Sequence, residues 1–323
     1  MKFKKLILYI FIFGISFSIT KADSFVVISG DDTVLEEKDM HNKQSVASIS
    51  KIMTAIVAIE NGTLDKKVIV NKEATQVEGS SLYLKDKQTY SYKELLYGLM
   101  LRSGNDAAYL IANNSNLDYR SFINEMNVTA KRIGMINSTF NNESGLDING
   151  GNISTAYDMA ILMNYAMKNP IFKEICGTKL YDNTYKQRWK NKNKLLFNDK
   201  RIIAGKTGYT RLAGRTLVSY ASNDDLELII VSLNKLDDFE FHQSTYNLNF
   251  DQYKSIVVLD VGEYKYNNYY FKVLEPIKVT IKKDNSSKVT CSYKIEGNSL
   301  VLNVDNGIKT NVHTFPLNKA KML

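Results

Sequence analysis

The sequence holds few of the residues that build disulfide scaffolds and metal sites. Its 323 residues include two cysteines, Cys176 and Cys291, which lie far apart and in what we expect to be different domains, so no disulfide is predicted. The three histidines, His41, His242 and His313, show no metal-ligand spacing such as H-E-x-x-H. We therefore expect all three histidines at the surface, no bound metal and no cofactor.

The chain also lacks a long apolar run. The run from Leu6 to about Thr20 is shorter than the roughly 20 residues that a membrane-spanning helix needs. Lysines at positions 2, 4 and 5 precede it, and Thr20 and Ala22 suit cleavage after Ala22. This pattern predicts a secretory signal peptide over residues 1–22 and an extracytoplasmic protein, with an uncleaved membrane anchor as the alternative.

The overall composition is that of a globular protein with a large core. Hydrophobic residues make up 44% and charged residues 24% of the chain, which is too long for one small domain. The formal net charge of +8 is spread along the chain, which favours solvated surface over a docking site for an acidic partner. We therefore expect no nucleic-acid partner.

Hydrophobic periodicity divides the chain into a mixed first part and an all-β second part. Apolar segments flank Gly30-Asp31-Asp32 and predict a hairpin, which could join antiparallel strands expected at 202–210, 216–221 and 226–233. Helical spacing and capping residues predict helices over about 45–62, 91–102, from 106, 119–133, 155–167 and 239–253. Beyond about Lys254 strict alternation predicts strands. The predicted fold class is α+β, with a signal peptide at 1–22, a first domain at 23–253 and a small all-β domain at 254–323.

Two polar residues interrupt the start of the first predicted helix, "SVASISKIMTAIVAIENG". Ser48 and Lys51 are three residues apart and therefore lie on one face. Unpaired backbone N–H groups at a helix start favour a developing negative charge, which suits a nucleophile. A lysine desolvated against an apolar helix can have its pKa lowered enough to take the serine proton. A capping serine and a lysine that reaches the surface would give the same spacing.

Two further fragments favour the catalytic interpretation. "LRSGNDAA" places Ser103 and Asn105 between two predicted helices, and "IAGKTGYT" places Lys206, Thr207 and Gly208 on a predicted strand, in the order of one known type of active site. Lys206 and Thr207 offer a cation and a hydroxyl to a substrate carboxylate, and Gly208 lets the strand approach a ligand backbone. Ser103 can relay a proton to a leaving amine, and the Asn105 amide can bond a peptide group.

With these motifs, the sequence strongly resembles the low-molecular-mass penicillin-binding proteins that act as serine-type D-Ala-D-Ala carboxypeptidases. The resemblance covers most of residues 24 to 253 and is carried by "ASISKIMTA", "EGSSLYLKDKQTYSYKELLYGLMLRSGNDAA", "ESGLDINGGNISTAYDMAIL", "NKNKLL" and "AGKTGYTRLAGRTLVSYA". It implies the penicillin-binding-protein and β-lactamase-like transpeptidase fold, an antiparallel sheet covered by helices plus a helical subdomain, with the active site between them.

The resemblance also implies roles for the candidate residues. Ser48 would be the acylated nucleophile and Lys51 its base. The other assignments are a proton and substrate network of Ser103, Asn105 and Lys206, a carboxylate site at Thr207 beside Gly208, and an oxyanion hole from the backbone N–H groups of Ser48 and Tyr209. The implied substrate is a peptidoglycan stem peptide ending in D-Ala-D-Ala, the implied inhibitors are β-lactam antibiotics, and the implied location is the outer face of the cytoplasmic membrane or the cell wall of a bacterium.

The sequence departs from the family pattern in three places. Ser50 stands where Thr is frequent, which should be harmless, and Tyr209 follows K-T-G where His is common in some members, which should tune specificity. The family frequently ends in an amphipathic helix that lies on the membrane, and the final "VHTFPLNKAKML" shows no such helix. Either the membrane anchor is missing, or attachment to a membrane surface comes from another part of the protein.

Three alternatives share these motifs. A class A-type β-lactamase adds a glutamate that activates water, and the stretch Glu143 to Asp147 resembles its E-x-x-L-N loosely, although it fits the S-G-L-D of the carboxypeptidases better. A transpeptidase forms the same acyl-enzyme and passes the acyl group to an amine. A binding module that has lost turnover is the third alternative, and the intact motif set argues against it.

Overall fold

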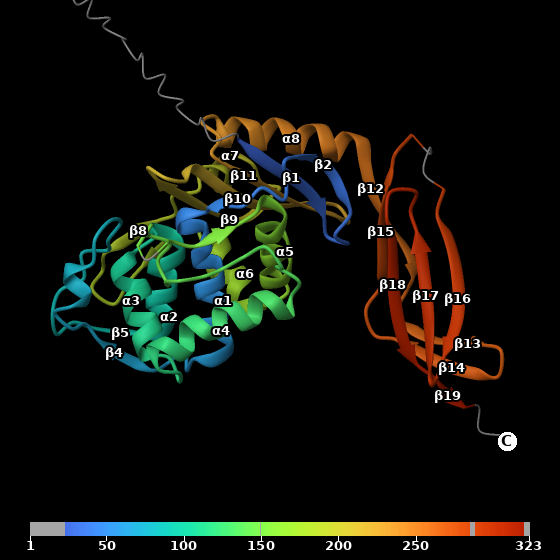
Figure 1. Ribbon diagram of the computed structural model, residues 1–323, viewed down its shortest axis with the longest axis horizontal. Coiled ribbons are helices and arrows are strands. Elements are labelled where there is room, and N and C mark those ends of the chain that lie inside the picture. Colours follow the sequence, from blue (N-terminus) through green and yellow to red (C-terminus); the bar gives the residue numbers. More distant parts are fainter. Residues whose placement is uncertain (1–22, 149, 285–287, 320–323) are drawn as a thin grey trace, which may run out of the picture.

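A computed structural model describes residues 23–148, 150–284 and 288–319. The signal peptide expected over residues 1–22 lies outside the described residues. The chain forms a first part of helices around a sheet and a second part made of strands, which stands beside it (Figure 1).

A five-stranded antiparallel sheet lies at the centre of the first part, in the order β2-β1-β11-β10-β9. Its strands are β1 (Ser24–Ser29), β2 (Val34–Lys38), β9 (Ile202–Thr210), β10 (Gly214–Asn223) and β11 (Leu226–Leu233). The predicted hairpin and the three predicted strands are thus confirmed, and the hairpin joins the sheet through β1, where Val26 lies opposite Val231. This pairing brings the two ends of the first part into one sheet.

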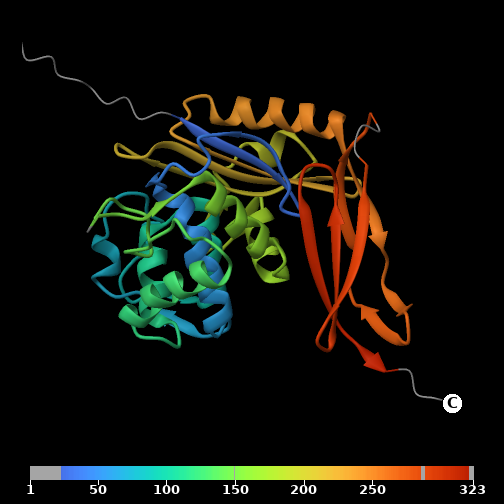
Figure 2. The ribbon, with the colours of Figure 1, turned by 45° about the vertical axis from the view of Figure 1, so that its right-hand side comes forward.

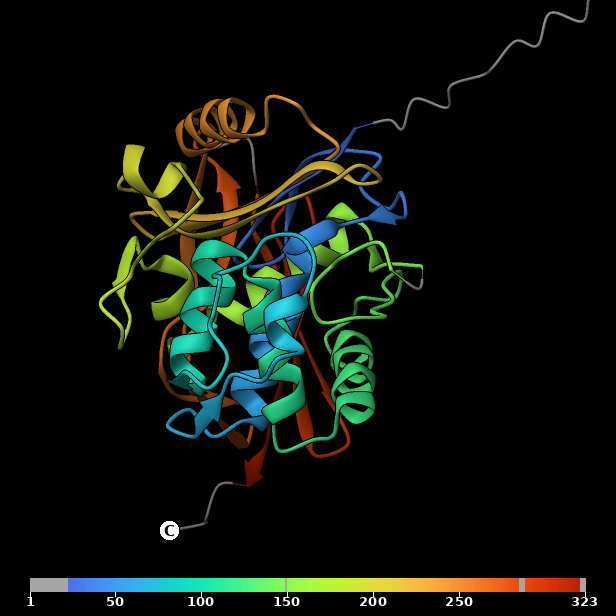
Figure 3. The ribbon, with the colours of Figure 1, turned by 90° about the vertical axis from the view of Figure 1, so that its left-hand side faces the viewer.

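The sheet is covered on both faces because apolar side chains of its inner strands alternate between two cores. Leu228 and Ile230 belong to a cluster with α8 (Asp238–Gln252), whereas Ile229 and Val231 belong to the larger cluster under the helical body. The α8 helix therefore lies on one face of the sheet and the other helices lie mainly on the opposite face (Figure 3). A strand that is buried on both faces has consecutive apolar residues, as β11 has from Leu228 to Val231.

The helical body packs against the inner face of the sheet. Its helical elements are η1 (Ala47–Ser50), α1 (Lys51–Asn61), η2 (Ala74–Gln76), α2 (Tyr92–Tyr97), the π-helical turn η3 (Gly98–Arg102), α3 (Asn105–Asn114), α4 (Tyr119–Arg132), α5 (Ala156–Met167), α6 (Pro170–Gly177) and α7 (Leu195–Asn198). Three short strand pairs border them: β3 (Gln44–Ser45) with β6 (Ile153–Ser154), β4 (Lys67–Ile69) with β5 (Thr89–Ser91), and β7 (Leu180–Asp182) with β8 (Arg188–Lys190). The capping box expected at Ser91 and Glu94 is present, because each side chain bonds the backbone N–H of the other residue.

The first predicted helix begins later than the sequence pattern indicates. Ser45 lies in β3, the next four residues form the 3₁₀ turn η1, and the α-helix starts at Lys51. Ala47 has a left-handed backbone with φ of 49°, a conformation that a right-handed helix cannot contain. The regular helix can therefore form only after this residue.

The expectation of a surface histidine at position 242 is wrong. His242 lies on α8, has no exposed surface, and its ring nitrogens lie 2.6 Å from Ser219 Oγ and 2.9 Å from Ser232 Oγ. Burial lowers the pKa of His242 to about 3, so the ring is neutral. Two hydroxyls from neighbouring strands satisfy the ring, which is why a polar side chain can face this core.

The second part of the chain has a core of its own. It consists of β12 (Tyr253–Leu259), β13 (Gly262–Tyr266), β14 (Tyr269–Val273), β15 (Ile277–Lys282), β16 (Thr290–Glu296), β17 (Ser299–Asp305), β18 (Thr310–Pro316) and β19 (Asn318–Lys319). These strands form the sheets β12-β15, β13-β14-β19 and β16-β17-β18. Alternate residues of β15 and β17, such as Val279 and Leu302, pack between the sheets, so the alternation seen in the sequence marks the inner face.

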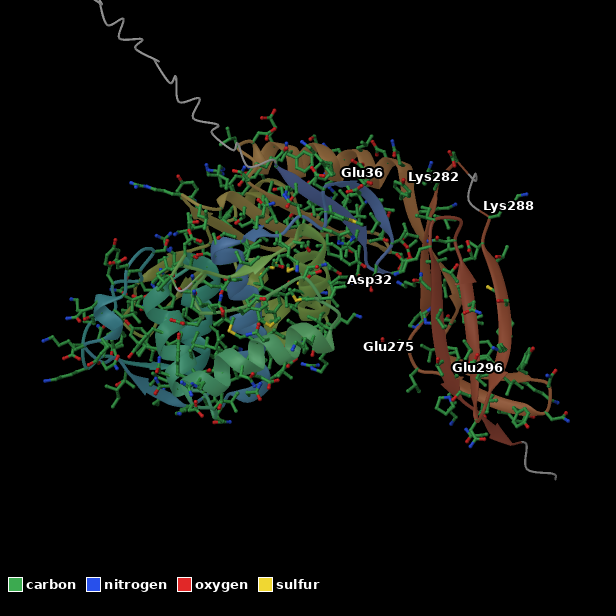
Figure 4. The ribbon with its side chains drawn as sticks, in the orientation of Figure 1. Asp32, Glu36, Glu275, Lys282, Lys288 and Glu296 are labelled. Atoms are coloured by element: carbon green, nitrogen blue, oxygen red, sulfur yellow. The ribbon has the colours of Figure 1, made fainter. Side chains whose placement is uncertain are left out.

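The two parts meet at the turn between β1 and β2. The Asp31 carboxylate accepts hydrogen bonds from the backbone N–H and the hydroxyl of Thr280, at 3.0 and 2.8 Å, and Asn306 donates to the Thr33 hydroxyl at 3.2 Å. Figure 2 shows α8 leading directly into the second part, and Figure 4 shows Asp32 at the junction. The junction is therefore hydrogen-bonded as well as covalently continuous.

Three general properties bear on function. No helix in the described ranges is long and apolar enough to cross a membrane. The described part of the chain contains no group of three or more His, Cys, Asp or Glu side chains arranged as metal ligands would be. Cys176 is buried in the first part, Cys291 is exposed on β16, and both thiols are free.

Candidate active site

Ser48 and Lys51 lie together where η1 passes into α1. Lys51 Nζ donates a hydrogen bond to Ser48 Oγ at 3.1 Å. Ser48 is partly exposed, whereas Lys51 is completely buried. The left-handed Ala47 immediately before Ser48 stores backbone strain of the kind often found at functional sites.

The Lys51 ammonium has three acceptors around it. Besides Ser48 Oγ, its Nζ donates to Asn105 Oδ1 at 2.7 Å and to the backbone carbonyl of Ser144. Burial lowers the pKa of Lys51 to about 7, while the carboxylate of Glu143 acts in the opposite direction. The expected fall in this pKa is therefore present, and a neutral Lys51 is accessible at physiological pH.

The acceptors also orient the amine when it is neutral. The carbonyl oxygens of Asn105 and Ser144 can only accept, so they take the two remaining hydrogens of a neutral Lys51. The lone pair of the nitrogen is then left toward Ser48, the third neighbour. This arrangement suits removal of the Ser48 proton by Lys51.

A loop that carries Ser144 packs tightly against η1. Gly145 has φ of 79°, and a Cβ added there would lie 2.1 Å from the Ala47 carbonyl oxygen and 2.5 Å from Ser50 Oγ. Asn152 donates to Ser50 Oγ at 3.0 Å and to the Asn142 carbonyl at 2.9 Å. Only glycine fits this approach, which fixes the carbonyl of the preceding residue beside Lys51.

Ser103 and Lys206 meet on the opposite side of the site. Ser103 ends η3 in a left-handed conformation with φ of 63°, and its Oγ accepts a hydrogen bond of 3.0 Å from Lys206 Nζ. Lys206 also donates to the Thr207 carbonyl at 2.7 Å and is 1% exposed. Burial, with Lys51 nearby, holds the pKa of Lys206 well below its ordinary value.

Asn105 connects the two sides through the start of α3. Its Oδ1 accepts from Lys51, and its Nδ2 donates to the Glu78 carbonyl at 2.6 Å. Among the described residues this leaves one amide hydrogen of Asn105 without an acceptor, so its expected contact with a peptide group stays a prediction. Its observed contacts make it a support of Lys51.

The K-T-G strand β9 lies directly against η1. A Cβ at Gly208 would lie 2.4 Å from Thr216 Oγ1 and 3.0 Å from the backbone nitrogen of Ser48. Glycine is therefore needed for contact with η1 itself, in addition to the expected ligand. The next residue, Tyr209, is 67% exposed. Because β9 lies against η1, the backbone N–H groups of Ser48 and Tyr209 that are proposed for an oxyanion hole come from adjacent segments.

These segments enclose a pocket of about 290 Å³. It is lined by Ser48, Ser80, Ser103, Lys192, Thr207, Gly208, Tyr209, Arg215, Asp238 and Phe239. The structure thus brings all eight candidate residues together, with Lys51, Asn105 and Lys206 beneath the lining. The pocket can accommodate a peptide end next to a serine that has a lysine base.

The sequence analysis assigned no role to several residues of the site. Ser144 acts through its backbone carbonyl, which no side chain reveals, although it lies in the quoted stretch "ESGLD". Lys192, from "NKNKLL", donates to Ser80 Oγ at 3.2 Å. Arg215 and Asp238 are paired at 2.7 Å, and they carried no sequence signal because they lie on different elements.

Comparisons with known proteins point to the family of this chain. The sequence pattern of the D-alanyl-D-alanine carboxypeptidase family, Peptidase_S11, matches residues 16–237. D-alanyl-D-alanine carboxypeptidase DacF of Bacillus subtilis is 29% identical over 303 residues, which are 86% of this chain and 77% of the relative.

Two solved structures extend the comparison to the fold. Penicillin binding protein 5 from Haemophilus influenzae has a TM-score of 0.79 at 21% identity, with 92% of this chain and 96% of that one covered, so the likeness in fold includes the second part. Penicillin-Binding Protein D2 from Listeria monocytogenes, in its ampicillin-bound form, has a TM-score of 0.63 at 26% identity, with 70% and 95% covered. This chain therefore belongs to the D-alanyl-D-alanine carboxypeptidase family of serine hydrolases, within the low-molecular-mass penicillin-binding proteins.

Proposed function

We propose that this enzyme removes the terminal D-Ala from peptidoglycan stem pentapeptides through an acyl-enzyme on Ser48. The observation that carries the proposal is the hydrogen bond between Ser48 Oγ and a buried Lys51, whose two other acceptors are carbonyl oxygens. In this arrangement Lys51 is the base, Ser103 and Lys206 form the proton relay, and Thr207 receives the substrate carboxylate.

Acylation begins with neutral Lys51. Its Nζ takes the Ser48 proton while Oγ attacks the carbonyl carbon of the penultimate D-Ala, and the backbone N–H groups of Ser48 and Tyr209 stabilise the oxyanion. The peptide C–N bond then breaks. The departing amine needs one proton, the same number that Ser48 has given up, and Ser103 with its hydrogen-bonded Lys206 relays it.

Hydrolysis of the ester repeats these transfers with water as the nucleophile. Water loses a proton as it attacks, and the Ser48 oxygen regains one as it leaves. A β-lactam would acylate the same oxygen, but its amine stays attached after the ring opens. The ampicillin-bound relative supports β-lactams as inhibitors of this chain.

The position of Glu143 favours a carboxypeptidase over a class A-type β-lactamase. Its carboxylate accepts a hydrogen bond of 2.8 Å from the Tyr119 hydroxyl, is 7% exposed, and is not among the residues that line the pocket. A carboxylate in that position is not placed to activate water for deacylation. The transpeptidase alternative differs only in the acceptor of the acyl group.

The proposed organisation is a signal peptide at 1–22, a catalytic domain at 23–253 and a β domain at 254–323. The signal peptide pattern supports export to the outer face of the cytoplasmic membrane or the cell wall of a bacterium. Every candidate site residue precedes Lys254, which supports a catalytic domain that ends near this position.

The function is tested with the mature chain, benzylpenicillin and a stem pentapeptide. Mass spectrometry of penicillin-treated protein should locate one penicilloyl group on Ser48, and Ser48→Ala should carry none. Free D-Ala should appear from the pentapeptide without cross-linked product when no amine acceptor is present. A penicilloyl group on another serine would refute the assignment of Ser48 as the nucleophile. Cross-linked product that exceeds free D-Ala when an amine acceptor is added would favour the transpeptidase.

A further inference from the structure

The strand β16 forms an open edge of the second part. It is an outer strand of the sheet β16-β17-β18, and among the described strands it pairs with β17 alone. Its other side faces away from the first part (Figure 1), and all seven of its residues are exposed. The backbone N–H and C=O groups on that side therefore have no strand to pair with in the described part of the chain.

The side chains of this edge are partly apolar. Tyr293 and Ile295 lie directly opposite Leu302 and Leu300 of β17 and therefore share their face of the sheet. The two leucines are completely buried, whereas Tyr293 and Ile295 are each 37% exposed. Cys291, on the same face, is exposed as well. The apolar inner face of the sheet thus continues onto β16, where the described residues cover it only in part.

The edge also lacks the features that usually prevent strands of separate molecules from pairing. Natural edge strands carry charges, bulges or proline, or are covered by another segment. In the central sheet, β2 carries Glu36 and Lys38 and has an irregular register with β1, and β9 is covered by η1. The strand β18 ends at Pro316. By contrast, β16 has no proline, its register with β17 is unbroken, and its charges, Lys294 and Glu296, form a salt bridge of 2.7 Å with each other.

The sequence of β16 is complementary to itself about its middle residue, Tyr293. When two identical antiparallel strands are related by a two-fold axis, one residue lies opposite its own copy and the others match symmetrically around it. Centring on Tyr293 pairs the whole strand. Cys291 then lies opposite Ile295 of the second copy on the apolar face, and Ser292 lies opposite Lys294 on the polar face. No like charges face each other, whereas centring on Lys294 would place two lysines directly opposite, which is destabilising.

We propose that two copies of this chain associate through β16, paired antiparallel and centred on Tyr293. The two three-stranded sheets then form one sheet of six strands, in which the exposed apolar side chains gain cross-strand neighbours. The junction with the first part lies at the opposite edge of each sheet, where Asn311 of β18 donates to Asp31 at 3.4 Å. The dimer therefore presents two active sites at its far ends, and no catalytic residue takes part in the interface.

The first test is the mass of the mature chain in solution. Sedimentation equilibrium over a range of concentrations, with a reductant present, should show a dimer that dissociates on dilution. Ser292→Lys places the new charge opposite Lys294 of the second copy, twice by symmetry, and should raise the Kd of the dimer by about two- to thirty-fold. Ser292→Glu should lower this Kd by a similar factor. The matched control is Thr314→Lys, at an exposed position of β18 on the other edge of the same sheet, and it should leave the Kd unchanged.

The second test establishes the register by disulfide cross-linking. Ile295→Cys places a thiol opposite Cys291 of the second copy, at a Cα separation that a disulfide can bridge. Mild oxidation should therefore give a covalent dimer. The wild-type chain should give none, and neither should Ile295→Cys combined with Cys291→Ser, because their exposed thiols are not opposite each other in this register. Cys176 is buried and takes no part.

A chain that stays monomeric at every concentration would overturn the proposal. A Kd that both Ser292 variants shift in the same direction would also overturn it, as would cross-linking that persists after Cys291→Ser. Each variant should keep the melting temperature of the wild-type monomer, because the substituted side chains are exposed, and it should still be labelled by penicillin.

Discussion

The rate of acylation by penicillin should depend on pH through Lys51. Burial lowers the pKa of Lys51 to about 7, and only the neutral amine can take the Ser48 proton. Below this pKa the neutral fraction falls ten-fold for each pH unit. Between pH 6 and pH 8 it rises from roughly one tenth to roughly nine tenths. The acylation rate constant should therefore increase about ten-fold over this interval and level off above it.

The assay is the rate of labelling by a fluorescent penicillin, measured from pH 5.5 to pH 8.5 at constant ionic strength. Two variants test whether the midpoint belongs to Lys51. The Glu143 carboxylate raises the Lys51 pKa and the Lys192 cation lowers it, so Glu143→Gln should move the midpoint to lower pH and Lys192→Gln to higher pH. A rate that varies less than two-fold between pH 6 and pH 8, or midpoints that move together, would refute Lys51 as the base.

Four further results are expected. Gly145→Ala should abolish penicillin labelling and lower the melting temperature, because its Cβ would lie 2.1 Å from the Ala47 carbonyl oxygen; unchanged labelling would show that the loop can move. His242 is neutral when folded, with a pKa of about 3, whereas in the unfolded chain it binds a proton below about pH 6.5. The free energy of unfolding, measured with urea, should therefore fall by roughly 1.4 kcal/mol for each unit by which the pH is lowered between these values, and His242→Gln should show a correspondingly smaller slope. Residues 23–253 expressed alone should release D-Ala, and a folded but inactive fragment would contradict the proposed domain division. In the full chain, Asp31→Ala should make the second part more sensitive to proteolysis, since it removes both Thr280 hydrogen bonds.

Local sequence determined most of the secondary structure. The capping box at Ser91, the apolar strand Leu226–Leu233 and the alternation of the C-terminal strands were all predicted, because each depends on spacing within a short segment. The three motifs identified the candidate residues for a similar reason, since each is a short run of required side chains. The resemblance to the penicillin-binding proteins then supplied the arrangement of the sheet and helices as an expectation, which the fold confirms.

Only the tertiary structure decided how these residues act on one another. The Ser144 carbonyl reaches Lys51 across 93 positions of sequence, and a backbone oxygen leaves no mark in a sequence. The late start of α1 depends on the left-handed Ala47, which the apolar periodicity does not show.

The surroundings of His242 and Arg215 could not be predicted from the sequence for the same reason. His242 is buried because hydroxyls from β10 and β11 bond its ring, and Arg215 is oriented because Asp238 begins a helix beside its strand. Each of these partnerships joins separate elements and is created by packing. The sequence by itself determined which side chains and which elements are present, whereas the distances and burial that set their pKa values and their roles exist only once the chain is folded.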